Sequence, residues 1–471
     1  MKIKKHLMLA LLLLLANSSW AQLKWLKVSA GAEFAFALRS DSTIWSWGFN
    51  GNGQLGNGNT ITNSLPAQIG TDKDWVDITA GAMSGFGIKA NGTLWAWGFN
   101  NIGTLGDGTI TQRLQPVQIG NDNNWLTIEC GQAHTLAIKT DHTLWSWGFN
   151  YTGQLGLGDT VNRHVPTLVD TSHQWVAIAA GGYHSLALKL NGTLWAWGSN
   201  ANGQLGDTLA AISTLSYYPV QIDVATDWKS ISAGFQYSLA MKNNNSLWAW
   251  GFNGNGQVGD GTNVEKKLPV QIGNGQSWKS IAAGGASAYA LNVHNVLYSW
   301  GYDGYGQLGN GGSGQQNTPT ITDVDSSWKS IAASDGLFYN SSVFGLSCYG
   351  LKTNADIICT AGANYIGQLG DGTTSSEDVF NCATGSLMVG IADLDNEKGN
   401  ISIYPNPTSD KISIKGIEQP SIVIVNLMGQ KLVTSHGSNE LSLAHLPAGL
   451  YLVQVFNKDM ELVKSEKVIK E

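Results

Sequence analysis

The 471-residue chain is poor in charge, in proline and in cysteine. Only 13% of its residues are charged, and the net charge is −7, so the basic excess typical of nucleic-acid-binding proteins is missing. Its four cysteines, at 130, 348, 359 and 382, form no C-x-x-C pair and accompany no H-x-x-x-H spacing, which argues against a zinc site. No G-x-S-x-G, P-loop or H-E-x-x-H motif occurs. Nothing beyond the N-terminus is apolar over a length that could cross a membrane.

The N-terminus has the composition of a secretory signal peptide. Three lysines among the first five residues precede an apolar run over 7–15, and small residues end the segment at Ala21. We expect cleavage after Ala21, with residues 1–21 removed; the alternative is a membrane anchor. Export would permit a disulfide among the three cysteines close together in the sequence, without choosing the pair.

What the chain has in abundance is glycine, with 58 residues, and tryptophan, with 19. Both recur at a period near 50 residues. A glycine heads the same loop motif seven times, at Gly48, Gly98, Gly148, Gly198, Gly251, Gly301 and Gly362. A second motif, close to W-x-x-[IV]-x-[AC]-G, begins at Trp25, Trp75, Trp125, Trp175, Trp228, Trp278 and Trp328. Such self-similarity predicts a repeat architecture.

Each repeat predicts four short strands. In the copy that starts at Trp175, "WVAIAAGG", "HSLALK", "LWAWG" and "YPVQI" read as strands, and Asn-Gly marks a hairpin between the second and third. Four strands per repeat, seven times, predict an all-β fold, a seven-bladed β-propeller over residues 22–389. The paired tryptophans of the third strand then pack blade against blade. We expect the last strand, within 375–383, to close the ring by meeting the first strand, 26–30.

The loop "GNGQLG" at 51–56 matches the G-x-G-x-x-G fingerprint of dinucleotide-binding proteins. That fingerprint opens a helix and occurs once per site, whereas this loop occurs seven times and is followed by turn formers. Its first glycine is replaced in four copies. We therefore predict no cofactor and no metal, and assign the constant glycines to turns that need positive φ or close backbone approach. These are Gly53, Gly56, Gly103, Gly106, Gly153, Gly156, Gly203, Gly206, Gly256, Gly259, Gly306, Gly309, Gly367 and Gly370.

The stretches "LWAWGSNANGQLGD" and "GGYHSLALKLNGT", with the 50-residue period, resemble the regulator-of-chromosome-condensation repeat family. The resemblance implies the seven-bladed propeller. Founding members of that family are nuclear and act on a small GTPase and on nucleosomes. For an exported, mildly acidic chain we expect neither nucleic acid nor a small GTPase as partner. Secreted binders also use this fold, and function depends on the loops.

The tryptophan pattern ends near residue 390. A polar linker, 390–399, leads to residues 400–471, whose alternating β-branched residues predict a small β-sandwich. "YPNP", "MGQ" and "LPAGLYLV" resemble the C-terminal sorting domain of the type IX (Por) secretion system. The resemblance implies recognition by an outer-membrane translocon, followed by release or attachment at the cell surface. An immunoglobulin-like accessory domain is the alternative.

Candidate chemistry is sparse. His134 and His184 share a repeat position that other copies fill with unrelated residues, so we interpret them as structural. The acids after the loop, such as Asp107 and Asp260, suit turns better than metal sites. We therefore predict a recognition module, a monomeric binder of a protein or glycan, and not an enzyme. The alternative is a secreted polysaccharide- or protein-degrading enzyme with its site at the channel mouth.

Two sets of residues are candidates for the binding surface. A ring of aromatic residues follows the loop glycine, and we expect it to lie in the core: Phe49, Phe99, Phe149, Phe252 and Tyr302, with Ser199 and Ala363 in the other copies. Loop residues that differ between copies are the better candidates for exposed partner-binding positions. They are Asn101, Tyr151, Ala201, Tyr305 and Tyr365.

Overall fold

The computed structural model describes residues 23–207, 214–334, 337–339, 342–344, 346–353, 357–384, 401–425, 431–458 and 462–470. The proposed signal peptide and the proposed linker lie outside these residues. The described chain is built of strands, and none of it forms a helix long and apolar enough to span a membrane.

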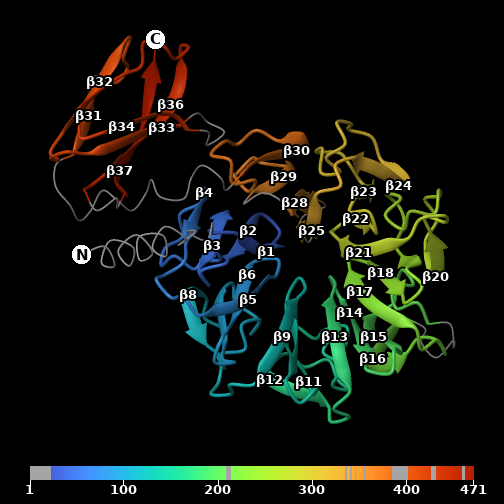
Figure 1. Ribbon diagram of the computed structural model, residues 1–471. Helices are drawn as coiled ribbons and strands as arrows, with labels where there is room; N and C mark the ends of the chain where they lie inside the picture. The colour runs from blue at the N-terminus through green and yellow to red at the C-terminus, as the bar shows by residue number, and fades with distance from the viewer. Residues whose placement is uncertain are drawn as a thin grey trace, which may run out of the picture.

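Seven four-stranded antiparallel blades surround a central axis (Figure 1). The first three blades are β1–β4 (Trp25–Ala30, Phe34–Arg39, Ile44–Gly48, Asn63–Gln68), β5–β8 (Trp75–Ala80, Ser84–Lys89, Leu94–Gly98, Arg113–Gln118) and β9–β12 (Trp125–Cys130, His134–Lys139, Leu144–Gly148, Arg163–Asp170). The next three are β13–β16 (Trp175–Ala180, His184–Lys189, Leu194–Ser199, Leu215–Gln221), β17–β20 (Trp228–Ala233, Tyr237–Lys242, Leu247–Gly251, Lys266–Ile272) and β21–β24 (Trp278–Ala283, Ser287–Asn292, Leu297–Gly301, Gln316–Asp323). Blade 7 contains β25 (Trp328–Ala333), β28 (Ser347–Lys352), β29 (Ile358–Gly362) and β30 (Glu377–Thr384).

The burial of each strand follows its place in the blade. The second strand is buried along almost its whole length, as in Phe34–Arg39, whereas the fourth strand is largely exposed at the outer edge. The tight hairpin between strands two and three needs positive φ. Gly92 and Gly192 supply it in two blades, while His142 and Asn245 adopt it in two others, as Asn-like side chains tolerate this region better than most.

The ring does not close as the sequence analysis predicted. β30 pairs with β29, apart from an isolated bridge between Val379 and Asn310 of blade 6, and it is the outermost strand of blade 7, whereas β1 is the innermost strand of blade 1 and pairs with β2. The expected pairing of 375–383 with 26–30 is therefore wrong. Each blade takes its four strands from one repeat, and blades 7 and 1 meet by side-chain packing, in which Trp25 and Trp47 share a core with Tyr349 and Leu351.

Tryptophans join the blades. In blades 2 to 6 the second Trp of the third strand is fully buried, and its indole Nε1 donates to a loop carbonyl of the preceding blade: Trp97 to Gln54, Trp147 to Thr104, Trp197 to Gln154, Trp250 to Gln204, and Trp300 to Gln257. In blades 1 to 5 the Trp that opens the repeat packs edge-on against the first Trp of the third strand, as Trp175 does on Trp195 at 5.8 Å. The structure thus confirms the prediction that the tryptophans pack blade against blade.

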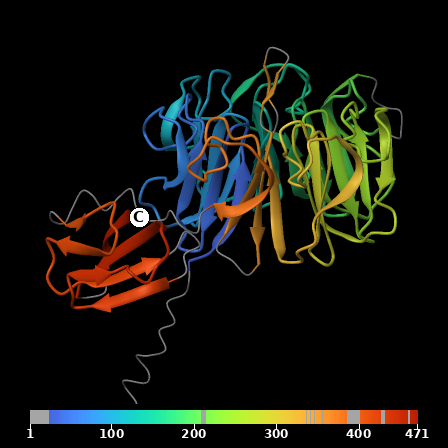
Figure 2. The ribbon, with the colours of Figure 1, turned by 90° about the horizontal axis from the view of Figure 1, so that it is seen from above.

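Blade 7 departs from the pattern because Ala361 and Cys359 occupy its two Trp positions. Phe380 fills the space against Trp328 at 4.9 Å, and the hydroxyl of Tyr289 donates to the Gln307 carbonyl in place of an indole. A disulfide joins Cys359 to Cys382, so β29 and β30 are covalently linked. Cys130 and Cys348 are buried and are not joined by a disulfide. The insertion forms a hairpin, β26 (Leu337–Tyr339) and β27 (Ser342–Phe344), which projects from one end of the ring (Figure 2).

The C-terminal residues form two small antiparallel sheets, as expected of a β-sandwich. One contains β31 (Ser402–Tyr404), β32 (Lys411–Lys415) and β35 (Glu440–Ser442). The other contains β34 (Lys431–His436), β33 (Ser421–Val425), β36 (Gly449–Phe456) and β37 (Leu462–Lys470). Ile412, Ile424 and Val453 are among the residues of the core between them.

Candidate binding faces and the central channel

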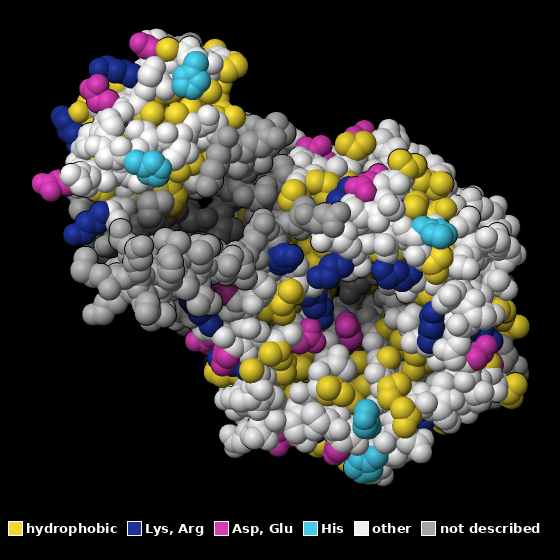
Figure 3. Space-filling model, in the orientation of Figure 1, with side chains coloured by type: hydrophobic (Ala, Val, Ile, Leu, Met, Phe, Trp, Pro, Cys, Tyr) yellow, Lys and Arg dark blue, Asp and Glu magenta, His cyan; other side chains and the backbone are white. Residues whose placement is uncertain are grey.

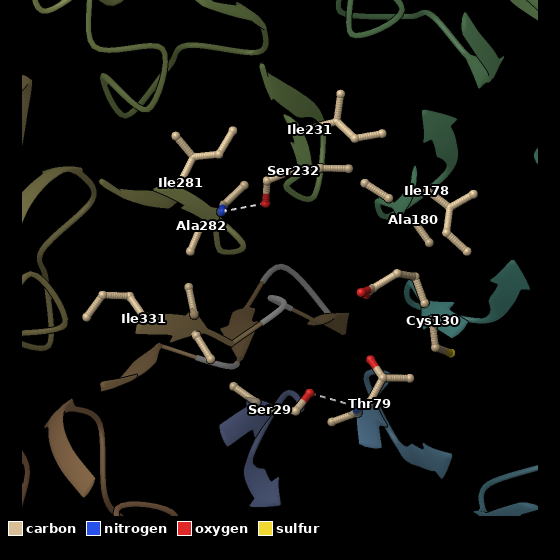
Figure 4. A pocket seen from close by; sticks show the side chains of 18 of the residues that line it. Ser29, Thr79, Cys130, Ile178, Ala180, Ile231, Ser232, Ile281, Ala282 and Ile331 are labelled. Carbon is tan, nitrogen blue, oxygen red and sulfur yellow. Dashed lines mark hydrogen bonds between the residues drawn. The ribbon is translucent and has the colours of Figure 1, made fainter. Parts of the chain in front are cut away.

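The propeller offers a channel and two ends. The innermost strands β1, β5, β9, β13, β17, β21 and β25 enclose a cavity of about 280 Å³ (Figure 4). Blades 4 to 7 line it with small and aliphatic side chains such as Ile231 and Ala282. Blades 1 to 3 contribute the charged groups, which are Glu129 and Lys27. Lys27 forms a 2.6 Å ion pair with Asp77. Among the lining residues, the charged side chains therefore lie on one side of the channel only.

Glu129 is the channel group whose protonation is most affected by its surroundings. Burial in the channel raises its pKa to about 7; the nearby Lys27 charge opposes this shift and Asp77 reinforces it. A carboxyl with a raised pKa in a cavity is a feature of many functional sites, although ion-pair networks in structural positions produce it too.

One end of the ring, which we call the hairpin face, carries the hairpins between second and third strands. Around the channel opening on this face, the second residue of each innermost strand is exposed. It is apolar in blades 1 to 4 (Leu26, Val76, Leu126 and Val176) and lysine in blades 5 to 7 (Lys229, Lys279 and Lys329). Figure 3 shows Lys and Arg side chains gathered about this opening.

The opposite end, the loop face, carries the glycine loops and the connections between first and second strands. The five variable residues, Asn101, Tyr151, Ala201, Tyr305 and Tyr365, are all exposed there. The aromatic ring that follows the loop glycine is half-buried, not part of the core as expected: its rings lean against the loop, and a Cβ on Gly51 would meet the Phe49 ring at 2.5 Å. Only Ala363 of that set is buried.

Two aromatic clusters extend this half-buried ring into solvent. In one, Tyr305 lies 6.3 Å from Tyr302 and 5.7 Å from Tyr365, so a single cluster spans blades 6 and 7. Burial raises the pKa of Tyr365 well above its usual range, and Tyr305 adds to the shift. Burial also raises the pKa of Tyr302, so the hydroxyls of Tyr302 and Tyr365 are protonated at neutral pH and can donate hydrogen bonds.

The second cluster joins blades 3, 4 and 5. Tyr151 stacks on Phe149, which contacts Tyr183, which in turn contacts Phe235 at 5.6 Å. Tyr151 is 75% exposed. The sequence analysis missed Tyr183 and Phe235. The signal that could have identified them is a large aromatic residue in the connection between the first and second strands, which in blades 1 to 3 contains Glu33, Met83 or Ala133.

The structure gives the histidines a structural role. His134 and His184 are buried, and each Nε2 hydrogen-bonds a serine hydroxyl of the next blade, Ser185 at 3.0 Å and Ser238 at 2.9 Å. Burial lowers the pKa of both to about 3, so both rings are neutral at physiological pH.

The loop acids also act locally. Asp107 accepts hydrogen bonds from Thr109 and from Asn100, and it pairs with Arg113 at 2.6 Å. Asp260 has the same contacts with Thr262, Asn253 and Lys266. Within the described residues, no group of three or more His, Cys, Asp or Glu side chains is placed to hold a metal ion.

The repeated glycines are needed by the loop geometry. Both constant glycines have positive φ in every copy, for example +73° at Gly53 and +68° at Gly56. A Cβ on Gly56 would lie 2.9 Å from the indole of Trp97, and the corresponding contact recurs at Gly106, Gly156, Gly206, Gly259 and Gly370. The third glycine thus lets the preceding blade approach the buried Trp of the next.

Together these features define a repeat protein: a seven-bladed β-propeller followed by a C-terminal β-sandwich. Models of the RCC1-like domain and of the regulator of chromosome condensation (RCC1) repeat match residues 13–225, 228–257, 244–291 and 295–337. The chain belongs to the RCC1-repeat family. A secretion system C-terminal sorting domain matches residues 402–471 and supports secretion or surface attachment through the type IX system.

Solved propellers have the same fold. Human WBSCR16 superposes with a TM-score of 0.60 at 20% identity, covering 66% of this chain and 85% of that one. Yeast RCC1 (Prp20), in a structure bound to Kap60, gives 0.61 at 22%, covering 70% and 80%. Prp20p from Saccharomyces cerevisiae gives 0.61 at 24%, covering 70% and 82%. A search of curated proteins found no match.

Proposed function

We propose that this protein is a secreted or surface-attached recognition module whose loop face binds a protein or glycan partner. The observation that carries the proposal is the cluster of Tyr302, Tyr305 and Tyr365, in which exposed rings are held in fixed contact across two blades. Rigid, amphipathic aromatic side chains lose little entropy on binding and supply much of the energy at recognition surfaces.

The rest of the loop face fits this role. Tyr151 presents a second exposed ring, held by Phe149 and the neighbouring Tyr183. Asn101 and Ala201 provide smaller exposed positions in the corresponding loops of blades 2 and 4. A rigid rim with aromatic anchors and variable small residues suits a large partner better than a small molecule.

Binding is tested with the full-length protein on arrays of glycans and of bacterial and host surface proteins. The double variant Tyr305→Ala/Tyr365→Ala is expected to weaken capture of the partner at least tenfold. Tyr218→Ala is the matched control, because Tyr218 is 62% exposed but lies on the outermost strand β16. Equal binding by both variants would show that the loop face is not the binding surface.

Export is tested separately. Fusing residues 398–471, which contain the sorting domain, to a reporter behind a signal peptide is expected to carry the reporter to the surface or medium of a cell with a type IX system. A reporter that stays in the periplasm would favour the accessory-domain alternative.

A hydrolase at the channel is the second candidate, and Glu129 is the observation that favours it. An acid whose pKa is near 7 could donate a proton to a leaving group. Its carboxylate neighbour Asp77 is paired with Lys27, and the channel walls are strands with aliphatic side chains. Turnover of a polysaccharide or protein that Glu129→Gln abolishes would establish this function in place of recognition.

A further inference from the structure

A repeated asparagine anchors the glycine loop, and one blade has an aspartate in its place. Asn50, Asn100, Asn150, Asn200, Asn253 and Asn364 occupy the second position after the loop glycine, and blade 6 has Asp303 there. All of these residues accept a hydrogen bond through Oδ1 from the backbone N–H five residues on; for Asp303 the donor is Leu308, at 2.9 Å.

The other side-chain atom is where blade 6 differs. In blade 1, Nδ2 of Asn50 donates to Asn57 Oδ1 and to the carbonyls of Asn59 and Ile61, at 3.0–3.1 Å. Nδ2 of Asn253 in blade 5 makes the corresponding bonds, to Asp260, Thr262 and Val264. The asparagine amide is therefore surrounded by oxygen acceptors.

Blade 6 keeps the surrounding loop. Gly312 N–H donates to Asn310 Oδ1 at 2.9 Å, as Thr262 does to Asp260, and Gly311 N–H bonds the Asp378 carbonyl, as Gly58 bonds Leu114. A Cβ placed on Gly312 would lie 3.1 Å from Asn310 Oδ1 and 3.9 Å from Asp303 Oδ2, so both oxygens approach the same point. Asp303 is fully buried, and its Oδ2 has no hydrogen-bond partner among the residues that the structure describes.

In blade 6 the carboxylate Oδ2 of Asp303 thus faces oxygen atoms, where blades 1 and 5 place the NH₂ group of an asparagine. A buried carboxylate without a partner is costly. In blades 2 and 5 the loop acids pair with Arg113 and Lys266, the first residues of the fourth strands, but the equivalent residue in blade 6 is Gln316. No salt bridge involving Asp303 or Asp378 occurs among the described residues.

We propose that the glycine loop of blade 6 binds a calcium ion through Asp303 Oδ2, Asn310 Oδ1 and the main-chain carbonyl of Gly312. Ca²⁺ takes oxygen ligands of this kind, carboxylate, amide and carbonyl, and tolerates irregular geometry. The ion occupies the place of the asparagine NH₂ group and supplies the positive charge that the loop lacks. The sequence analysis predicted no metal, so this site revises that expectation.

Two features favour a cation over a loop that is merely strained. The residue that packs on Gly306 in blade 6 is Asp378, whose Cβ would lie 2.8 Å from a Cβ on that glycine and whose negative charge acts on Asp303; the other blades have Leu114, His164, Tyr217, Lys267, Asn317 or Ser64 there. An entry path also exists, because Gly311, Gly312 and Gly314 are exposed and have no side chains to block the loop. The ion would fix the loop that carries Tyr302 and Tyr305.

The first experiment uses the full-length protein freed of metal by a chelator. Added CaCl₂ is expected to raise its thermal midpoint by roughly 2 °C or more, since a ligand that binds only the native state stabilises it. Tb³⁺, which replaces Ca²⁺ in oxygen sites, is expected to show luminescence on excitation of the neighbouring tyrosines, and CaCl₂ is expected to quench it. MgCl₂ at the same concentration is expected to produce a much smaller effect, because Mg²⁺ demands near-octahedral geometry.

The decisive variant is Asp303→Asn, which restores the residue of the other six blades. It is expected to fold, to lose the CaCl₂ shift and the Tb³⁺ signal, and to match or exceed the midpoint of the metal-free parent. Asp371→Asn is the matched control, since it changes an acid in the equivalent loop of blade 7 and should keep both responses. Asp378→Asn is expected to weaken calcium binding several-fold. A parent that gives neither response, or an Asp303→Asn protein that keeps both, overturns the proposal.

Discussion

The indole Nε1 of Trp47 donates a 2.9 Å hydrogen bond to the carbonyl of Gln368, although the two residues are 321 positions apart in the sequence. The same carbonyl accepts a 2.7 Å bond from the hydroxyl of Tyr349. Between other blades the same Trp-to-carbonyl bond spans about one repeat, as from Trp97 to Gln54. The two ends of the propeller are thus joined by the contact that also joins the five successive pairs of blades from blade 1 to blade 6, without a shared strand.

Replacing Trp47 by Phe tests this closure. The substitution removes the indole donor and leaves the Gln368 carbonyl with one bond fewer in a buried site, so the free energy of unfolding should fall by about 1–3 kcal/mol. Trp97→Phe is the control, because it removes the same bond between blades that are also adjacent in the chain. Urea denaturation should give similar losses for both.

Hydrogen exchange separates the two variants. Trp47→Phe should accelerate exchange in β1, β2 and β28, where blades 7 and 1 meet, because loss of this contact frees both chain ends of the ring. Trp97→Phe should leave those strands protected. Unchanged exchange at the junction in Trp47→Phe would mean that the shared core, not the indole bond, holds the ring closed.

The disulfide of blade 7 makes a second prediction. Cys359 and Cys382 are 23 residues apart and disulfide-bonded, while Cys130 and Cys348 keep their thiols. The denatured protein should therefore react with two equivalents of thiol reagent before reduction and four after it. The double variant Cys359→Ser/Cys382→Ser should lower the free energy of unfolding by about 2–4 kcal/mol. Four reactive thiols without reductant would contradict the assignment.

The repeat period was sufficient to predict most of the fold. Seven copies of one pattern predicted seven blades, the four strands of each and the packing role of the tryptophans, because every blade must solve the same burial problem. The closure was mispredicted for the same reason. A repeat pattern does not show at which strand a blade begins. In addition, the burial of Trp47 against blade 7 depends on contacts between residues more than 300 positions apart.

The exposed residues of the loop face could be predicted from the sequence only in part. Variation between copies correctly marked Tyr151, Tyr305 and Tyr365 as exposed, since residues without a common packing role are free to differ. It could not show that Tyr183 and Phe235 join the second cluster, because that needs the three-dimensional arrangement of neighbouring blades. Asp303 was visible as the single acid among seven loop anchors, but its meaning came from the unpartnered oxygen.

The glycines of the loop make a third prediction, which separates constant from variable positions. Gly56→Ala should destabilise the protein by several kcal/mol, because φ is +68° and the added Cβ would lie 2.9 Å from the buried Trp97. Gly51→Ala should have an effect of about 0.5 kcal/mol or less, because its φ is not positive and the nearest atom is the end of the half-buried Phe49 ring. Thermal unfolding of the two variants measures both, and equal losses would contradict the interpretation.

The channel acid makes the last prediction, a dependence of stability on pH. Burial raises the pKa of Glu129 from 4.5 to about 7, so the folded protein binds this proton more tightly than the unfolded chain does. Its contribution is fully present below about pH 4.5 and is lost as the pH rises through 7. With a discount for the solvent in the channel, the loss is on the order of 1–2 kcal/mol.

Glu129→Gln should remove that dependence, because glutamine resembles the protonated acid. The free energy of unfolding of the variant should match that of the parent at pH 4.5 and exceed it at pH 8, as measured by urea denaturation across this range. Glu265→Gln, on the exposed loop before β20, is the control that should follow the parent. The neighbouring Lys27 and Asp77 remain paired in both proteins, so a difference between parent and Glu129→Gln that does not grow from pH 4.5 to pH 8 would show that the Glu129 carboxyl is already ionised near its ordinary pKa.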